Sequence, residues 1–173
     1  NTHPDYQNLI AEEAKRGHTV AIHSASHKYD QIYTSEQAFF DDLEQMNSII
    51  KAQTGNDASI IRFPGGSSNT VSKDYCPGIM TQLVNDVTAR GLLYCDWNVS
   101  SGDANNKPIS TEQVVQNVIS GVQSHNVSVV LQHDIKDFSV NAVEQIIQWG
   151  QANGYTFLPL TTSSPMSHHR INN

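Results

Sequence analysis

Ser59-Ile60-Ile61-Arg62-Phe63-Pro64-Gly65-Gly66 joins a short apolar run to a charged residue and a sharp turn. Isoleucine favours a strand, and a proline followed by glycines favours a turn at its end. The same arrangement recurs in Val127-Ser128-Val129-Val130-Leu131-Gln132-His133-Asp134, where an apolar run again ends at ionisable residues. Both segments therefore predict buried strands with polar side chains at their C-terminal ends.

Helical patterns alternate with short apolar runs along the rest of the chain. Apolar residues at helical spacing, with serine or threonine before them and glycine after them, predict the helices. The expected helices are 6–16, 35–53, 79–89, 111–124 and 140–152, and the expected strands are 19–22, 59–62, 92–97, 127–132 and 155–158. This alternation predicts an α/β fold built from parallel βα units, and a single domain over residues 1–173.

Composition excludes several function classes. The chain has 173 residues, with 10 Lys and Arg against 17 Asp and Glu and a net charge of −7, so we expect no nucleic-acid partner. No apolar stretch approaches the roughly 18 residues of a membrane span, and no secretion signal begins at Asn1. Cys76 and Cys95 are too few for a disulfide scaffold. They are either buried thiols or one bridge.

Ionisable residues follow four consecutive predicted strands. In parallel α/β folds, the C-terminal ends of the strands lie on one rim, where active sites are built. The residues are, in chain order, His23, His27, Arg62, Asp96, Asp103, His133 and Asp134. We therefore expect an active site at this rim.

His23 and His27 have the spacing of two metal-binding imidazoles in a tight turn. A catalytic zinc site has three protein ligands, and the spacing identifies no third one. The alternative is a pair of unrelated polar histidines in a loop.

Arg62 and the turn after it are candidates for orienting a carboxylate and for offering backbone N–H groups to an oxyanion. The alternative is a simple turn with a surface ion pair. His133 suits general acid chemistry beside a carboxylate, either Asp96 or Asp103, although a histidine at a strand end is often structural. Trp97 is a core or pocket-wall residue.

Taken together, these segments resemble the polysaccharide deacetylase family, the NodB-homology domain or carbohydrate esterase family 4. The family's H-[ST]-x-x-H motif matches His23–His27, and its R-x-P-x-G motif matches Arg62–Gly66. Its L-x-H-D motif matches Leu131–Asp134, and its Asp beyond a strand-end Trp matches Asp103 after Trp97. The resemblance covers nearly the whole chain and implies a distorted (β/α) barrel of the NodB type.

The resemblance also implies an activity, a cofactor and roles for the site residues. The activity is metal-dependent hydrolysis of N-acetyl groups from a cell-wall glycan, specifically N-acetylglucosamine of peptidoglycan, and the metal is usually zinc. By role, the implied residues are His133 as general acid, Asp103 as the residue that tunes it, Arg62 as the residue that holds the base, His23 and His27 as metal ligands, and Gly65, Pro64 and Trp97 as oxyanion or substrate contacts.

One family motif is absent from the sequence. The family begins with a strand ending in T-F-D-D-G, which supplies the catalytic base and the third metal ligand. Asp41 and Asp42 lie inside a predicted helix without a following glycine, so we reject them as substitutes. The chain is therefore expected to be an N-terminally incomplete domain that lacks its first strand or strands and is inactive, or nearly so, alone.

The expected partners are the glycan and either the missing N-terminal segment or a second copy of the chain. The expected location is extracellular or at the cell surface, in a membrane-anchored parent protein. The alternatives are a non-catalytic glycan-binding member of the fold and a deacetylase of chitin-type or xylan substrates. His168 and His169, in the polar tail, are expected to be solvated and idle.

Overall fold

A computed structural model describes residues 6–105, 107 and 109–173. The chain divides into two compact units, each with its own hydrophobic core. The first unit comprises the residues up to Asp96 together with Pro159–Asn173, and the second unit comprises Trp97–Leu158. None of the described helices is both long and apolar enough to cross a membrane.

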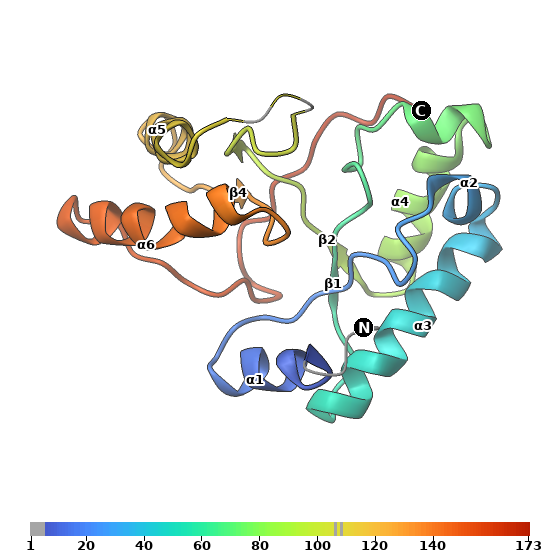
Figure 1. Cartoon of the computed structure of the whole chain (residues 1–173). Coiled ribbons are helices and arrows are strands. Elements are labelled where there is room, and N and C mark those ends of the chain that lie inside the picture. The colour runs from blue at the N-terminus through green and yellow to red at the C-terminus, as the bar shows by residue number, and fades with distance from the viewer. Residues whose placement is uncertain (1–5, 106, 108) are drawn as a thin grey trace. The chain divides into compact units, whose positions relative to one another are not determined.

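The first unit combines helices with one parallel strand pair (Figure 1). Its elements are α1 (Leu9–Lys15), α2 (Tyr29–Ile32), α3 (Glu36–Thr54), β1 (Ile60–Ile61), the 3₁₀ helix η2 (Val71–Asp74), α4 (Ile79–Ala89) and β2 (Leu93–Tyr94). β1 pairs with β2 in register Ile60 to Leu93, and Ile22 forms a parallel bridge to Ile61. The segment around Ile22 therefore adjoins β1 just before the two predicted metal-binding histidines.

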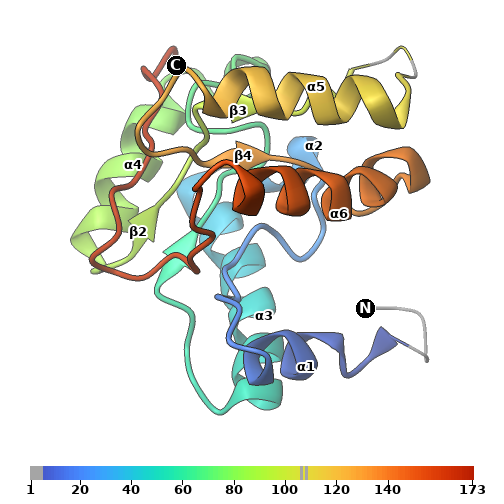
Figure 2. The ribbon, with the colours of Figure 1, turned by 90° about the vertical axis from the view of Figure 1, so that its left-hand side faces the viewer.

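Helix α3 shows how local signals set an element of the first unit. Ser35 caps it by accepting a hydrogen bond from the Ala38 N–H at 3.1 Å, and Gly55 ends it with a left-handed φ of 79°. Its buried face carries Phe39, Phe40, Leu43 and Ile50. α1 packs beside α3 (Figures 1 and 2).

The second unit is a parallel strand pair packed with two helices. Its elements are β3 (Val99–Ser100), α5 (Thr111–Val122), β4 (Val130–Leu131) and α6 (Asp137–Ala152). β3 pairs with β4 in register Val99 to Val130. α5 and α6 run side by side (Figure 2) and share a core of small apolar side chains, namely Val114, Val115, Val118, Ala142 and Ile146.

The alternation of helices with parallel strands is confirmed, and the individual strands differ from the prediction. All five predicted helices form. The expected strand 155–158 is wrong, because this segment pairs with no strand, and segment 19–22 makes a single bridge only. β3 and α2 were not predicted, because each is too short to show a period. The described strands make two separate pairs, so the closed barrel stays a prediction.

Candidate active site

His23 and His27 face one another through their Nε2 atoms, which lie 3.2 Å apart. The Nδ1 atom of His23 lies 2.9 Å from the carbonyl oxygen of Arg62. Because a carbonyl can only accept, this Nδ1 carries the proton, and the lone pair of the neutral ring is on Nε2. His27 adopts a left-handed φ of 55°, which is uncommon for a residue other than glycine.

The geometry of this pair fits two ligands of one divalent metal ion. Two nitrogen ligands about 2.0–2.1 Å from a tetrahedral zinc ion lie about 3.3 Å apart. The hydrogen bond from Nδ1 to a backbone carbonyl is the usual outer contact of a metal-binding histidine. Within residues 6–105, 107 and 109–173, no group of three or more His, Cys, Asp or Glu side chains has a metal-binding arrangement. The structure therefore brings the predicted pair together, and the metal itself stays a prediction.

Asp42 of α3 was missed as a functional residue. The sequence argues against Asp42 as a substitute for the absent catalytic base and third metal ligand, and it gives no other role to this residue. In the structure the Asp42 carboxylate accepts hydrogen bonds from the loop between the two histidines. Its distance of 18 residues from Ser24 left no local signal.

Arg62 extends from the end of β1 toward the end of β2. Its Nε donates to the carbonyl of Cys95 at 2.9 Å, and a terminal nitrogen donates to the carbonyl of Asp96 at 3.2 Å. These bonds fix the guanidinium in the first unit. The role of Arg62 in holding a catalytic base stays a prediction.

The turn after Arg62 is hydrogen-bonded by a buried tyrosine. The buried Tyr33 hydroxyl donates to the carbonyl of Pro64 at 2.7 Å. Gly65 and Gly66 both have positive φ, 78° and 79°, and Gly65 lies exposed at the turn. A rigid turn with an exposed glycine is consistent with the predicted oxyanion contact.

Asp96, one of the two carboxylates considered beside His133, is hydrogen-bonded within the first unit. Its buried carboxylate accepts hydrogen bonds from Ser67 N (2.8 Å), Ser67 Oγ (2.5 Å) and His169 N (2.9 Å), all in the first unit. Of the two tail histidines, His168 is exposed as expected, but neither is idle, because both contact residues of the first unit. His168 stacks on Tyr94 with ring centroids 4.0 Å apart.

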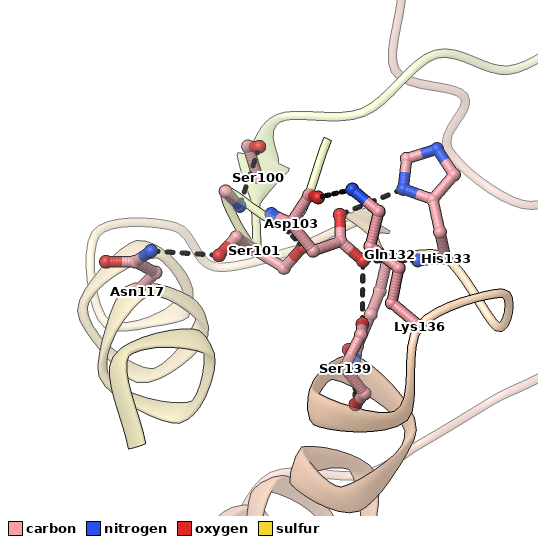
Figure 3. Close-up of polar contacts among 9 residues, drawn as sticks. Ser100, Ser101, Asp103, Asn117, Gln132, His133, Lys136 and Ser139 are labelled. Carbon is pink, nitrogen blue, oxygen red and sulfur yellow. Dashed lines mark hydrogen bonds and ion pairs between the residues drawn. The ribbon is translucent and has the colours of Figure 1, made fainter. Parts of the chain in front are cut away.

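Asp103 and His133 form a hydrogen-bonded pair in the second unit (Figure 3). Asp103 Oδ1 lies 2.9 Å from His133 Nδ1, and Oδ2 accepts the His133 backbone N–H at 2.7 Å. The Asp103 side chain is 1% exposed, whereas that of His133 is 36% exposed. Of the two carboxylates considered, Asp103 is the one beside His133.

The pKa of Asp103 follows from these contacts. Burial raises the pKa, but hydrogen bonds from Ser139, His133 and Ser101 outweigh burial and lower it to about 2. The carboxylate is therefore ionised at neutral pH and holds the Nδ1 proton of His133, which leaves Nε2 to react.

Further polar residues surround Asp103 and were missed by sequence reasoning. Ser139 Oγ donates to Oδ2 at 2.6 Å, and Lys136 Nζ donates to the Asp103 carbonyl. Gln132 Nε2 donates a hydrogen bond to the Ser139 carbonyl at 2.7 Å (Figure 3). Trp97 is half-buried at the start of this unit, and its predicted substrate contact is untested.

Comparison with known proteins agrees with these motifs. A family model described as polysaccharide deacetylase matches residues 1–76. The chain is 28% identical over 157 residues to peptidoglycan-N-acetylglucosamine deacetylase of Bacillus cereus, a match that covers 88% of this chain and 54% of that protein. The chain thus spans about half the length of this curated relative.

Solved structures extend the similarity to the whole chain. The catalytic domain of peptidoglycan N-acetylglucosamine deacetylase from Eubacterium rectale is 97% identical, with a TM-score of 0.97, over 100% of this chain and 79% of that chain. An esterase of carbohydrate esterase family 4 from Streptococcus mutans is 25% identical, with a TM-score of 0.75, over 92% of this chain and 70% of that chain. The chain therefore belongs to the polysaccharide deacetylase family.

Proposed function

We propose that this chain is the catalytic part of a metal-dependent deacetylase that acts on N-acetylglucosamine of peptidoglycan. The observation that carries the proposal is the His23–His27 pair, with Nε2 atoms 3.2 Å apart in a chain 97% identical to a catalytic domain of that description. The Asp103–His133 pair supplies a second set of groups suited to acyl-transfer chemistry.

The residues of the chain have separable tasks in this reaction. His23 and His27 would hold the metal through Nε2, and a bound divalent metal would supply a Lewis acid for the acetyl carbonyl and for water. Gly65 offers its backbone N–H to the oxyanion. His133, oriented by Asp103, gives a proton to the leaving nitrogen.

Arg62 is proposed to position the carboxylate base, and Pro64 and Trp97 to border the glycan. The bond that forms joins water oxygen to the acetyl carbon, and the bond that breaks is the amide C–N bond. The products are acetate and the free amine of the sugar.

We also propose an extracellular or cell-surface location, in a membrane-anchored parent protein. This follows from the proposed substrate, because peptidoglycan lies outside the cell membrane. The proposed partner is the glycan.

The test is acetate release from peptidoglycan, measured before chelation, after chelation and after zinc is added back. Two chains are compared, the 173-residue chain and one extended to the full length of the E. rectale structure. The extended chain should release acetate, lose activity with chelator and recover it with zinc. The 173-residue chain should be nearly inactive, because the motif expected to supply the base is absent from its sequence.

Variants separate the assigned roles. His23→Ala should abolish zinc-dependent activity, and His133→Ala should lower kcat by roughly 10²–10⁴-fold while zinc still binds. Glycan binding without acetate release by the extended chain would contradict the proposal and support a binding protein. Faster release from chitin or xylan fragments would contradict the proposed substrate.

A further inference from the structure

Asp42 makes three hydrogen bonds to the loop that joins the two histidines. Its Oδ2 accepts from Ser24 Oγ at 2.6 Å and from the Ala25 N–H at 2.9 Å. Its Oδ1 accepts from the Ser26 N–H at 2.9 Å. One carboxylate thus binds every residue between His23 and His27.

Ser24 links Asp42 to the backbone of His27 through a second hydrogen bond. A serine hydroxyl has one proton, and here that proton points to Asp42. The oxygen is then an acceptor for the His27 backbone N–H, which lies 2.8 Å away. The chain of contacts from Asp42 through Ser24 to His27 therefore fixes the backbone at the second imidazole.

The restraint acts on a backbone that would otherwise relax. A non-glycine residue in the left-handed region costs about 1 kcal/mol or more, and His27 has a φ of 55°. Bonds to a charged acceptor are among the stronger hydrogen bonds and offset such a cost.

Asp42 lies on a helix that packs into the core of the first unit. The residue lies in the interior of α3, and two nearby residues of the same helix, Phe40 and Leu43, have buried side chains. Burial raises the pKa of Asp42, but hydrogen bonds from Ser24, Ser26 and Ala25 outweigh burial and lower it. The acceptor is therefore both fixed in place and charged at neutral pH.

The neighbouring residue makes no such contacts. Asp41 is exposed and accepts a hydrogen bond from Gln37, one turn away in the same helix, at 2.7 Å. The two adjacent carboxylates therefore differ in partner rather than in chemistry, which makes Asp41 a matched control.

We infer that Asp42 is a positioning residue which, through Ser24, sets the separation of the His23 and His27 imidazoles for a divalent metal ion. This inference rests on the proposed function of the two histidines. Without the carboxylate, the Ala25 and Ser26 N–H groups lose their acceptor, and His27 can leave its left-handed conformation. Loss of such outer contacts typically lowers metal affinity about 10–100-fold.

The test is zinc affinity, measured by isothermal titration calorimetry on the full 173-residue chain. Asp42→Asn should bind zinc about 10–100-fold more weakly than wild type, and Asp41→Asn should bind like wild type. Circular dichroism and thermal unfolding establish that each variant is folded at the temperature of the titration. A folded Asp42→Asn variant with wild-type zinc affinity would overturn the inference.

Ser24 variants provide a second measurement if Asp42→Asn fails to fold. Ser24→Thr keeps the hydroxyl and should keep zinc affinity, whereas Ser24→Ala removes the contact to His27 and should lower it. Equal affinity of these two variants would overturn the inference as well.

His23→Ala separates this inference from the metal site itself. Wild-type zinc binding no tighter than that of His23→Ala would contradict the proposed metal site and the role of Asp42 with it. Tight wild-type binding that depends on His23 and is unchanged by Asp42→Asn would contradict the role of Asp42 alone.

Discussion

Gly65 shows how one backbone position controls the turn beside the candidate site. A Cβ at this position would lie 2.8 Å from the Tyr29 hydroxyl and 3.0 Å from Asn69 Cβ, at a φ of 78°. Gly55 has nearly the same φ, 79°, and open space around it. Position 65 thus combines a steric cost with a conformational cost, whereas position 55 has the conformational cost alone.

We therefore expect Gly65→Ala to destabilise the chain more than Gly55→Ala. The strained φ costs about 1 kcal/mol at either position, and the clash adds about 1–3 kcal/mol at position 65. The unfolding free energies in urea, compared between the two variants, measure the difference. Equal losses would show that Tyr29 and Asn69 move away freely.

The lowered pKa of Asp103 predicts that the free energy of unfolding changes with pH. Its folded pKa, about 2, lies below the value of an unfolded aspartate. Such a group stabilises the folded state above about pH 4, and the stabilisation is lost as the pH falls from about 4 toward 2. The loss is on the order of 2 kcal/mol, because the carboxylate is nearly fully buried.

The measurement is the unfolding free energy of wild type minus that of Asp103→Asn, at pH 6 and at pH 2.5. The difference should shrink at the lower pH. Asp57→Asn removes an exposed ion pair with Lys51 and should show a smaller dependence, because solvent screens exposed pairs. A pH-independent difference for Asp103→Asn would contradict the assigned pKa.

At the scale of elements, a Cβ added to either of two helical glycines would meet a different kind of neighbour. A Cβ on Gly121 of α5 would lie 2.4 Å from a methyl of Val99 in β3. A Cβ on Gly150 of α6 would lie 2.6 Å from the ring end of Phe157, a side chain that is 51% exposed. Valine is branched and buried, whereas the phenylalanine ring can rotate outward.

We expect opposite effects from the two alanine substitutions. Gly121→Ala should lower stability, because the clash with β3 exceeds the helix-propensity gain of about 1 kcal/mol. Gly150→Ala should be neutral or stabilising, because the ring of Phe157 can move and the propensity gain remains. Thermal unfolding of both variants measures this, and a destabilised Gly150→Ala would show that Phe157 is held in place.

At the scale of the whole molecule, the tail returns to the first unit. The Ser167 carbonyl accepts the Asp96 N–H at 2.7 Å, and the His169 N–H donates to the Asp96 carboxylate. The Asn173 carbonyl accepts the Thr81 N–H at 3.0 Å. Residues more than 70 positions apart are therefore joined by backbone contacts.

A chain ending at Ser164 should be less stable than the full chain. Removing a partner of a buried carboxylate costs about 1–3 kcal/mol, and Asp96 would lose two contacts. Chemical denaturation of the first unit, followed by the near-ultraviolet signal of its tyrosines, measures the loss. Thr162→Ala, in an exposed part of the tail, serves as the control and should leave stability unchanged.

Helices and motif order were predictable because both depend on neighbours in the chain. Predicted helix 79–89 has the observed bounds of α4, and the longest helical pattern begins after Ser35, one of the two residues, Thr34 and Ser35, that its sequence offers as a cap. Capping, helical periodicity and glycine termination act over three or four residues, so a short stretch of sequence is enough to predict them.

The pairing of polar groups was not predictable, because it joins residues far apart in sequence. Periodicity left Asp96 and Asp103 equivalent as partners of His133, and only the motif that places an Asp after Trp97 favoured Asp103. The structure shows the contacts themselves, with Ser67 and the tail at Asp96 and with Ser139 and His133 at Asp103. The contact of Asp42 with Ser24 and the unpaired segment 155–158 have the same origin. A strand or a buried carboxylate needs a partner supplied by the fold, and only the three-dimensional arrangement of the chain provides one.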